Sequence, residues 1–439
     1  MNPDLRAQLL SSIHADRLVI VCGAGLSMAP PSSLPAAWKV AEDCFENYRL
    51  SIDPDADLAL RHDLEALAQT FVDADTLETV FIERLVPWNK FVRQPNPGHA
   101  AVADLLTTKA AIAALSANYD TLIERYAIDN GFDFQASIDG EDATVRAATQ
   151  GPLLKFHGCS TIDRKATVWA PSQLDVPPIS NRIQRSREWM TANLRQKDLL
   201  VVGFWSDWDY LNAVLGEVLA GIAPLSVTVF DPAPPENLQE KAPDLWNIAN
   251  GEGVNFDHVQ QSGADALDEL RNAFSTNYIR RLLASGKQTY ADIEGSEVDP
   301  EHLEVDDLDS EALYGLRRDA EGVPAGEPAT RKHPINCEIL GAFHLLLRKA
   351  GAAQTVFGYE LNGRSIRVVN GAGVALNQLK ARFAEAPALG STDIIVAPGA
   401  TDLSMPGNVV REGRVGDFVR PLSSGLWLSF ETGRQELEV

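Results

Sequence analysis

The hydrophobic residues between positions 17 and 275 fall into short runs separated by amphipathic stretches. The run at 17–25, RLVIVCGAG, is apolar up to its glycines, as expected for a buried parallel strand that enters a tight turn. Similar runs bounded by turn residues lie at 111–116, 153–156, 199–203 and 226–230. Stretches such as 119–128 and 209–219 have helical spacing instead. Strands that alternate with helices predict an α/β fold with a doubly wound parallel sheet.

The remainder of the chain predicts an end to this domain and a second, smaller one. A last strand, a turn at Gly263 and an amphipathic helix are expected within 256–274, so the first domain is expected to span residues 1–285. Residues 286–333 are acidic and poor in aromatic side chains, which indicates a solvated linker or a marginal helix. A small α+β domain is expected over 334–439. Its helix is EILGAFHLLLRKAG, and its strand candidates lie at 355–361, 365–369, 393–396 and 426–431.

Composition excludes several classes of function. The net charge of −23 and the pI near 4.7 make the surface repel phosphates, so direct nucleic-acid binding is not expected. The chain lacks an apolar run of eighteen residues and begins without the pattern of a signal peptide, so we expect no membrane span and a cytoplasmic location. Its four cysteines lie far apart without a CxxC pair, so neither a metal site nor a disulfide framework is expected.

Several polar residues follow the predicted strands, where a doubly wound sheet forms its ligand crevice. Gly23-Ala24-Gly25 lets a pyrophosphate approach the backbone closely, although a bare GxG is also common in tight turns. Asn118 and His157 are candidates for catalysis. The sequence also allows Asn118 to be a helix N-cap and His157 to be a satisfied strand-end residue. Asp231 either starts the turn DPAPP or accepts hydrogen bonds from a ribose.

His99 differs from these candidates because it follows a proline-rich turn, PNP, at a predicted helix start. It is therefore expected to pack or to cap that helix rather than to catalyse.

Five segments together resemble the sirtuin family. The run 23–27, GAGLS, resembles the GAGxS signature that opens sirtuin domains. Four further segments follow in the sirtuin order: PNPGH at 95–99, SANYD at 116–120, FHG at 156–158, and VVGF at 201–204 with Ser206 and Asp207 after it. Each segment is short, but their shared order and their positions after predicted strands make the resemblance specific over roughly residues 17–275.

The resemblance implies a Rossmann-like sheet of the sirtuin type that takes NAD as its substrate. It implies that Asn118 orients the ribose and the attacking water, that His157 acts as a base, and that Asp120 helps to hold the nicotinamide or its ribose. The residues expected to bind NAD are Gly23, Ala24, Gly25, Ser27, Asp120, Gly203, Phe204, Ser206 and Asp231.

The chain departs from protein deacylases after His157-Gly158. Deacylating sirtuins usually carry four zinc-binding cysteines there, whereas this chain has Cys159 alone, so no zinc is expected. The chain therefore resembles zinc-less sirtuin-like NAD hydrolases of bacterial antiphage defence. That resemblance implies NAD depletion to ADP-ribose and nicotinamide, a homo-oligomer, and a defence partner such as a HerA-type ATPase, with residues 334–439 as an oligomerisation or regulatory module. Two alternatives stay open: a protein deacylase or ADP-ribosyltransferase, and a non-catalytic module that binds NAD or ADP-ribose.

Overall fold

The computed structural model describes residues 1–147, 151–203, 214–218, 221–305, 308–324, 326–384, 392–401 and 425–439. The chain divides into two compact units. The first unit comprises Met1–Ile128 and Asp133–Leu270, and the second comprises Asp129–Phe132 and Arg271–Val439. The boundary falls inside helix α12 (Gly263–Ser285), whose last residue is the end expected for the first domain.

The first unit contains a six-stranded sheet in the order β3-β2-β1-β4-β5-β6, and every neighbouring pair of strands is parallel. The strands are β1 (Leu18–Cys22), β2 (Ala113–Ser116), β3 (Leu153–Leu154), β4 (Asp198–Val202), β5 (Ser226–Phe230) and β6 (Asn255–Val259). This is the doubly wound, Rossmann-like order, so the prediction of the fold class is confirmed. The order reverses between β1 and β4, and in such sheets the crevice at this reversal, outside the carboxyl ends of the strands, is where ligands bind.

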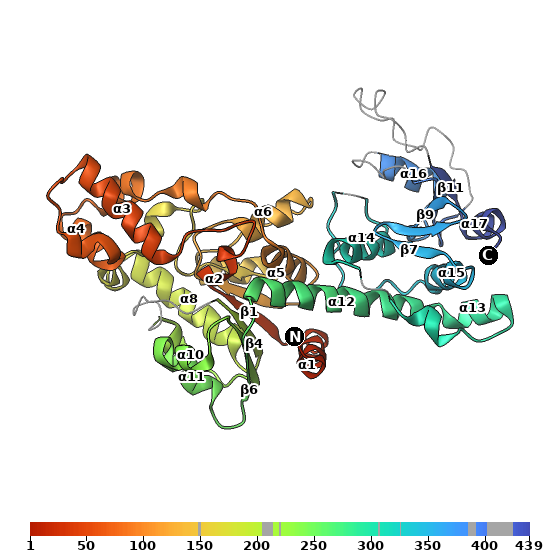
Figure 1. The fold of residues 1–439 in the computed structure, drawn as a ribbon, viewed down its shortest axis with the longest axis horizontal. Helices are drawn as coiled ribbons and strands as arrows, with labels where there is room; N and C mark the ends of the chain where they lie inside the picture. Colours follow the sequence, from red (N-terminus) through yellow and green to blue (C-terminus); the bar gives the residue numbers. More distant parts are fainter. Residues whose placement is uncertain are drawn as a thin grey trace. The chain divides into compact units, whose positions relative to one another are not determined.

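Helices cover both faces of this sheet (Figure 1). Val19 and Val21 of β1 pack with apolar residues of α7 (Gly140–Arg146), α8 (Ile179–Leu194), α10 (Pro235–Lys241) and α11 (Pro243–Ala249). On the other face lie α1 (Pro3–His14) and α5 (Pro97–Thr107). Because both faces are covered, all five residues of β1 are buried, which explains its uninterrupted apolar sequence.

A helical segment between β1 and β2 forms a second apolar cluster of this unit. It begins after the short helix α2 (Ala24–Met28). Its elements are α3 (Ala37–Ser51), η1 (Leu58–His62), α4 (Leu64–Asp73), η2 (Leu77–Leu85) and η3 (Trp88–Phe91). Phe45, Phe81 and Trp88 pack there with Tyr119 and Trp169, which come from the loops after β2 and β3. The cluster therefore supports the loop that follows β2 from one side.

The second unit is built on a mixed sheet in the order β11-β10-β9-β8-β7. The strands are β7 (Ala353–Thr355), β8 (Gly358–Leu361), β9 (Arg364–Val368), β10 (Ile394–Val396) and β11 (Leu426–Leu428). Strands β9, β10 and β11 pair in parallel, whereas β7, β8 and β9 pair antiparallel. One face of β10, with Ile394 and Val396, joins the core that contains α15 (Glu338–Lys349) and α17 (Phe430–Leu437), and Ile395 packs on the opposite face with α16 (Leu376–Ala384). A small C-terminal α+β unit is thus present.

Two expectations about local structure differ from what is observed. The stretch expected as a solvated linker or a marginal helix contains α13 (Lys287–Glu294), η6 (Pro300–Leu303) and α14 (Ser310–Glu321). Leu313 and Leu316 of α14 lie in the core of the second unit. The many acidic residues of this stretch make the apolar positions of the helix hard to recognise from composition. The helix expected over 119–128 is α6 (Leu122–Asp129), which begins three residues later.

Within the described ranges no helix combines the length and apolarity needed to cross a bilayer. In the same ranges no group of three or more His, Cys, Asp or Glu residues is placed to hold a metal ion. All four cysteines belong to the described part of the chain and are free thiols.

Candidate functional site

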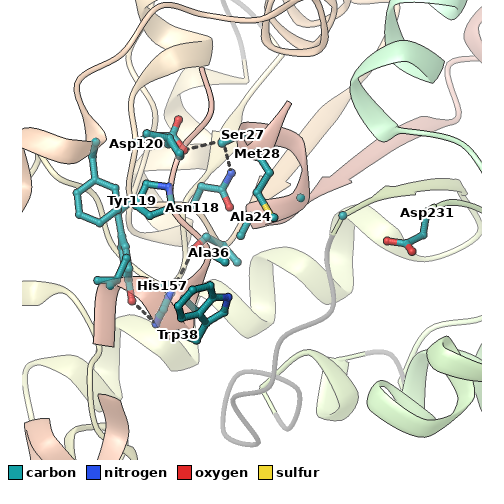
Figure 2. A pocket seen from close by; sticks show the side chains of 18 of the residues that line it. Ala24, Ser27, Met28, Ala36, Trp38, Asn118, Tyr119, Asp120, His157 and Asp231 are labelled. Carbon is teal, nitrogen blue, oxygen red and sulfur yellow. Dashed lines mark hydrogen bonds between the residues drawn. The ribbon is translucent and has the colours of Figure 1, made fainter. Parts of the chain in front are cut away.

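A cavity of about 290 Å³ lies at the carboxyl edge of the first sheet, where its strand order reverses (Figure 2). The turns after β1 to β5 each contribute to its wall: Ala24, Gly25, Ser27 and Met28 after β1; Ala117, Asn118, Tyr119 and Asp120 after β2; His157 after β3; Gly203 after β4; and Asp231 after β5. The segment from Leu34 to Trp38 closes another side. Parallel strands thus bring residues far apart in the sequence into one cavity.

Gly25 and Gly203 allow the turns after β1 and β4 to touch. The Gly25 N–H donates to the Gly203 carbonyl at 3.1 Å, and the Gly23 N–H donates to the Val202 carbonyl at 3.0 Å. A Cβ on Gly25 would lie 2.7 Å from the Gly203 Cα, and Gly203 has φ +55°. These glycines therefore permit close approach of two backbones. The N–H groups of Gly23 and Gly25 are already bonded to backbone carbonyls, which differs from the expected role of donating to a pyrophosphate, and α2 is only five residues long.

Asn118 is held with its side-chain carbonyl free for a ligand. Its Nδ2 donates to the Gly23 carbonyl at 3.1 Å and to Ser27 Oγ at 2.9 Å. Because the Gly23 carbonyl can only accept, this amide orientation is determined by the contact. Oδ1 has no hydrogen-bond partner among the described residues, and Asn118 is half-buried in the cavity wall. Asn118 is not an N-cap, because α6 begins at Leu122, whose N–H bonds to Asp120 Oδ1 at 3.1 Å.

Ser27, His99 and Asp120 form a buried network that holds Asn118. The Asn96 N–H donates to His99 Nδ1 at 3.2 Å, so the imidazole hydrogen is on Nε2, which donates to Ser27 Oγ at 3.0 Å. Ser27 in turn donates to Asp120 Oδ2 at 2.8 Å. Ser27 Oγ thus accepts from His99 and Asn118, donates to Asp120, and has no remaining bonding capacity.

This trio does not form a nucleophilic triad. Both His99 nitrogens are used, one as the acceptor in the capping box of α5 and the other as a donor to Ser27, so His99 has no lone pair to take a proton from the serine. Burial lowers the pKa of His99 to about 4, against the opposing effect of Asp120. His99 is therefore neutral and structural, and its expected capping role is observed.

His157 lies beside Tyr119 in the cavity wall and is 1% exposed. Its Nδ1 is 3.1 Å from the Ala117 carbonyl and must carry the hydrogen, so Nε2 accepts from the Tyr119 hydroxyl at 3.1 Å. The following Gly158 has φ +134°, and a Cβ there would lie 2.6 Å from Thr167 Oγ1, which explains a glycine at this turn. Burial lowers the pKa of His157 to about 3. The imidazole is therefore neutral and a weak base.

Lys155 holds the loop after β2 in place through buried contacts. Its Nζ lies 2.7 Å from Glu124 Oε1 and also donates to the backbone carbonyl of Asp120. Both side chains are buried, at 1% and 5% exposure. Burial alone lowers the pKa of Lys155, but the attraction of Glu124, with smaller contributions from Cys159 and Asp120, raises it above its ordinary value. A charged lysine thus holds the Asp120 backbone in place.

Asp231 and Lys241 are charged residues that line the cavity. Asp231 Oδ1 accepts from the Ala233 N–H at 2.5 Å, so the residue does start the turn after β5. Half-burial raises the pKa of its carboxyl group. Figure 2 shows Asp231 apart from the group formed by Tyr119, His157 and Trp38. The cavity therefore has two chemically different ends.

Most residues expected at the site line this one cavity. They are Ala24, Gly25, Ser27, Asn118, Asp120, His157, Gly203 and Asp231. Gly23 lies behind the wall, where its carbonyl holds Asn118. Phe204 and Ser206 lie outside the described residues.

The sequence did not single out Tyr119, Lys155, Lys241 or the exposed position of Trp38 in the cavity wall. One signal was available for Lys155. A lone lysine in the apolar run LLKF requires a buried partner.

No protein-family model matches this chain, and no curated protein matches it. Solved structures of Sir2 homologues are similar to it at low identity. One in complex with 2′-O-acetyl ADP-ribose has 17% identity, covers 62% of this chain and 95% of its own, and has a TM-score of 0.35. A Sir2 homologue–NAD complex has 17% identity, coverages of 60% and 91%, and a TM-score of 0.32. An ADP-ribose complex has 18% identity, coverages of 62% and 95%, and a TM-score of 0.34.

Such low TM-scores do not define a fold or an activity. The strand order and the cavity instead define the class: a doubly wound α/β protein with a polar ligand cavity at its strand-order reversal.

Proposed function

We propose that this protein hydrolyses NAD⁺ to ADP-ribose and nicotinamide. The observation that carries the proposal is the convergence of Asn118 Oδ1 and the neutral His157 in one cavity at the strand-order reversal. The two-ended cavity is compatible with a dinucleotide, with its reacting ribose near Asn118 and its other nucleoside near Asp231. The resemblance to sirtuins over residues 17–275 supports NAD as the molecule.

Hydrolysis of NAD⁺ requires little covalent chemistry from the protein. The nicotinamide ring of NAD⁺ is a cation, so breaking its bond to ribose neutralises the leaving group and leaves positive charge on the sugar. Asn118 Oδ1 accepts a hydrogen bond from a ribose hydroxyl or from the attacking water, which orients the reacting groups. The Asp120 carboxylate, held by Ser27 and the Leu122 N–H, provides negative charge nearby for the developing cation.

His157 takes the proton that the attacking water loses. Nε2 carries the lone pair for this step when the hydrogen of the neutral imidazole is on Nδ1, which lies 3.1 Å from the Ala117 carbonyl. Because burial lowers the pKa of His157 to about 3, the imidazole is a weak base in this arrangement. We therefore expect slow turnover by the isolated chain and faster turnover once assembly or a partner rearranges the cavity wall.

The proposed biological role is NAD depletion during phage infection. It rests on the resemblance to zinc-less sirtuin-like defence proteins, together with the chemistry of the site. In this proposal residues 1–285 form the hydrolase domain, and residues 334–439 form an oligomerisation or regulatory module. A homo-oligomer and a HerA-type ATPase or similar defence partner are the proposed associates, acting in the cytoplasm.

One experiment separates the proposed function from its two alternatives. The full chain is incubated with NAD⁺ alone, and ADP-ribose and nicotinamide are quantified by chromatography over hours. Equal release of both products without any peptide supports hydrolysis. Product formation only after an acylated peptide or a protein acceptor is added would instead support the deacylase or transferase. Binding of NAD⁺ without any product under either condition would support the non-catalytic module.

A further inference from the structure

Trp38 has an unusual environment for a large aromatic side chain. It lines the cavity, yet it is 60% exposed. Within the described ranges its indole makes neither a hydrogen bond nor a ring contact. In Figure 2 it projects near His157 and Ala36, away from Asp231. An indole face is therefore available at the end of the cavity where Asn118 and His157 lie.

Other described tryptophans of the first unit are packed. Trp88 and Trp169 are 8% and 1% exposed and stack edge-to-face with a ring separation of 5.9 Å. Trp189 is 6% exposed, and Trp246 packs on Phe256. Exposure of Trp38 is thus not a general property of this unit. The neighbouring cavity wall is also apolar, with Leu34 and Pro35 in the same segment and the half-exposed Met28 across the turn.

We infer that Trp38 is the residue that binds the cationic pyridinium ring of the dinucleotide, by a cation–π contact with the face of its indole. This inference rests on the proposed function. Tryptophan has the strongest ring quadrupole of the aromatic side chains, and a cation over its face is attracted electrostatically. Leu34 and Pro35 place apolar surface beside the indole, so the ring meets fewer competing polar groups there.

The contact distinguishes substrate from product by charge. The ring is a cation in NAD⁺ and is neutral in free nicotinamide, so Trp38 binds the substrate ring more tightly than the leaving group. Because the attraction is present in the ground state and weakens as the bond breaks, it lowers KM without raising kcat. Trp38 is in this sense a positioning and specificity residue that releases its ligand once the chemistry is done.

The test compares NAD⁺ with NADH, which has almost the same shape but a neutral nicotinamide ring. Binding of each is measured by calorimetry on the full chain carrying Asn118→Ala to suppress turnover, with Trp38 intact or changed to Phe or Leu. Trp38→Leu should weaken NAD⁺ binding roughly two- to thirty-fold and leave NADH binding nearly unchanged. Trp38→Phe should lie between, since it keeps an aromatic face with a weaker quadrupole.

Kinetics on the chain with Asn118 intact provide the second readout. Trp38→Leu should raise KM for NAD⁺ by the same factor without lowering kcat, and its melting temperature should stay unchanged because the side chain is mostly exposed. Leu50→Ala is the matched control, since Leu50 is 84% exposed and does not line the cavity.

The outcomes separate this inference from the proposed function. An equal loss of affinity for NAD⁺ and NADH, no loss for either, or no binding of NAD⁺ at all would each overturn the role of Trp38. Charge-selective binding without any hydrolysis would leave the inference standing and end the proposed function alone. Hydrolysis with an unchanged KM in Trp38→Leu would support the proposed function and overturn the role of Trp38.

Discussion

The two units of the chain each place an asparagine two residues after a parallel strand, and the two asparagines use their amides differently. Asn118 follows β2, donates from Nδ2 to Gly23 and Ser27, and keeps Oδ1 for the cavity. Asn370 follows β9 and is fully buried. Its Nδ2 donates to the Ala320 carbonyl at 3.0 Å, and its Oδ1 accepts from the Ala372 N–H at 2.9 Å.

Each unit also has a buried histidine beside a tyrosine hydroxyl: His157 in the first unit and His344 in the second. His157 accepts from the Tyr119 hydroxyl at 3.1 Å, and His344 Nδ1 lies 2.8 Å from the Tyr359 hydroxyl. Burial lowers the pKa of each imidazole to about 3. His157 lines the cavity, whereas His344 lies on α15 among the core residues of the second unit. The two histidines therefore share residue type and burial, and they differ in whether the side chain lines a cavity that a ligand can enter.

The largest expected effect tests this difference directly. Asn118→Ala should lower NAD⁺ turnover roughly a hundredfold to a thousandfold, because it removes the oriented acceptor. Asn370→Ala should leave turnover within a few-fold and lower the stability of the second unit instead, by about 1–3 kcal/mol, because it leaves buried backbone groups unpaired. Turnover is measured at saturating NAD⁺, and stability by urea titration. Similar turnover in the two variants would contradict the comparison.

Acid should destabilise the first unit more than the second. His99 and His157 in the first unit, and His344 in the second, have pKa values lowered by burial to about 4, 3 and 3. The unfolded chain, with histidine pKa values near 6.5, binds protons that the folded chain rejects, so stability is highest above pH 6.5 and falls as the pH drops toward the folded values. Between pH 7 and 4.5 the loss from these groups should be about 5 kcal/mol for the first unit and about 3 kcal/mol for the second.

Hydrogen exchange followed by mass spectrometry measures the two units separately in the full chain. The first unit should lose protection at higher pH than the second. Replacing His344 by Gln should flatten the acid dependence of the second unit without affecting the first. Loss of protection in both units at the same pH, with the same slope, would refute the expected difference.

The smallest effect compares two glycines. Gly25→Ala should destabilise the first unit by about 1–3 kcal/mol, because the new methyl group meets the Gly203 backbone. Gly315 lies inside α14 of the second unit, and a Cβ there meets nothing within 4 Å. Gly315→Ala should therefore stabilise the second unit by about 0.5–1 kcal/mol through helix propensity. Melting curves of the two variants measure both changes, and a stable Gly25→Ala protein would show that the two turns can separate.

Much of the fold could be predicted because its signals are local. The apolar runs that end in turn residues located β1 to β5, and the alternation with helical segments indicated a parallel sheet. Charge dominates the composition of residues 286–333, so the sequence indicates only a linker or a marginal helix there. The helices observed in that stretch are stabilised by contacts of residues such as Leu313 and Leu316 with a core made by distant parts of the chain. The helix α6 begins at Leu122, three residues later than expected, and the Leu122 N–H bonds to the Asp120 carboxylate in the preceding loop.

The order of residues along the chain is enough to show that polar residues follow the strands, and hence that several of them meet at one edge of a sheet. Tertiary structure alone decided which of those residues keep a free hydrogen-bonding group, because the partners that occupy an amide or imidazole come from other strands. Hydrogen bonds with His99, Asn118 and Asp120 use the full bonding capacity of Ser27 Oγ, while Asn118 keeps Oδ1 for the cavity. Whether Trp38 is buried or exposed was decided in the same way, by the packing of the segment that carries it.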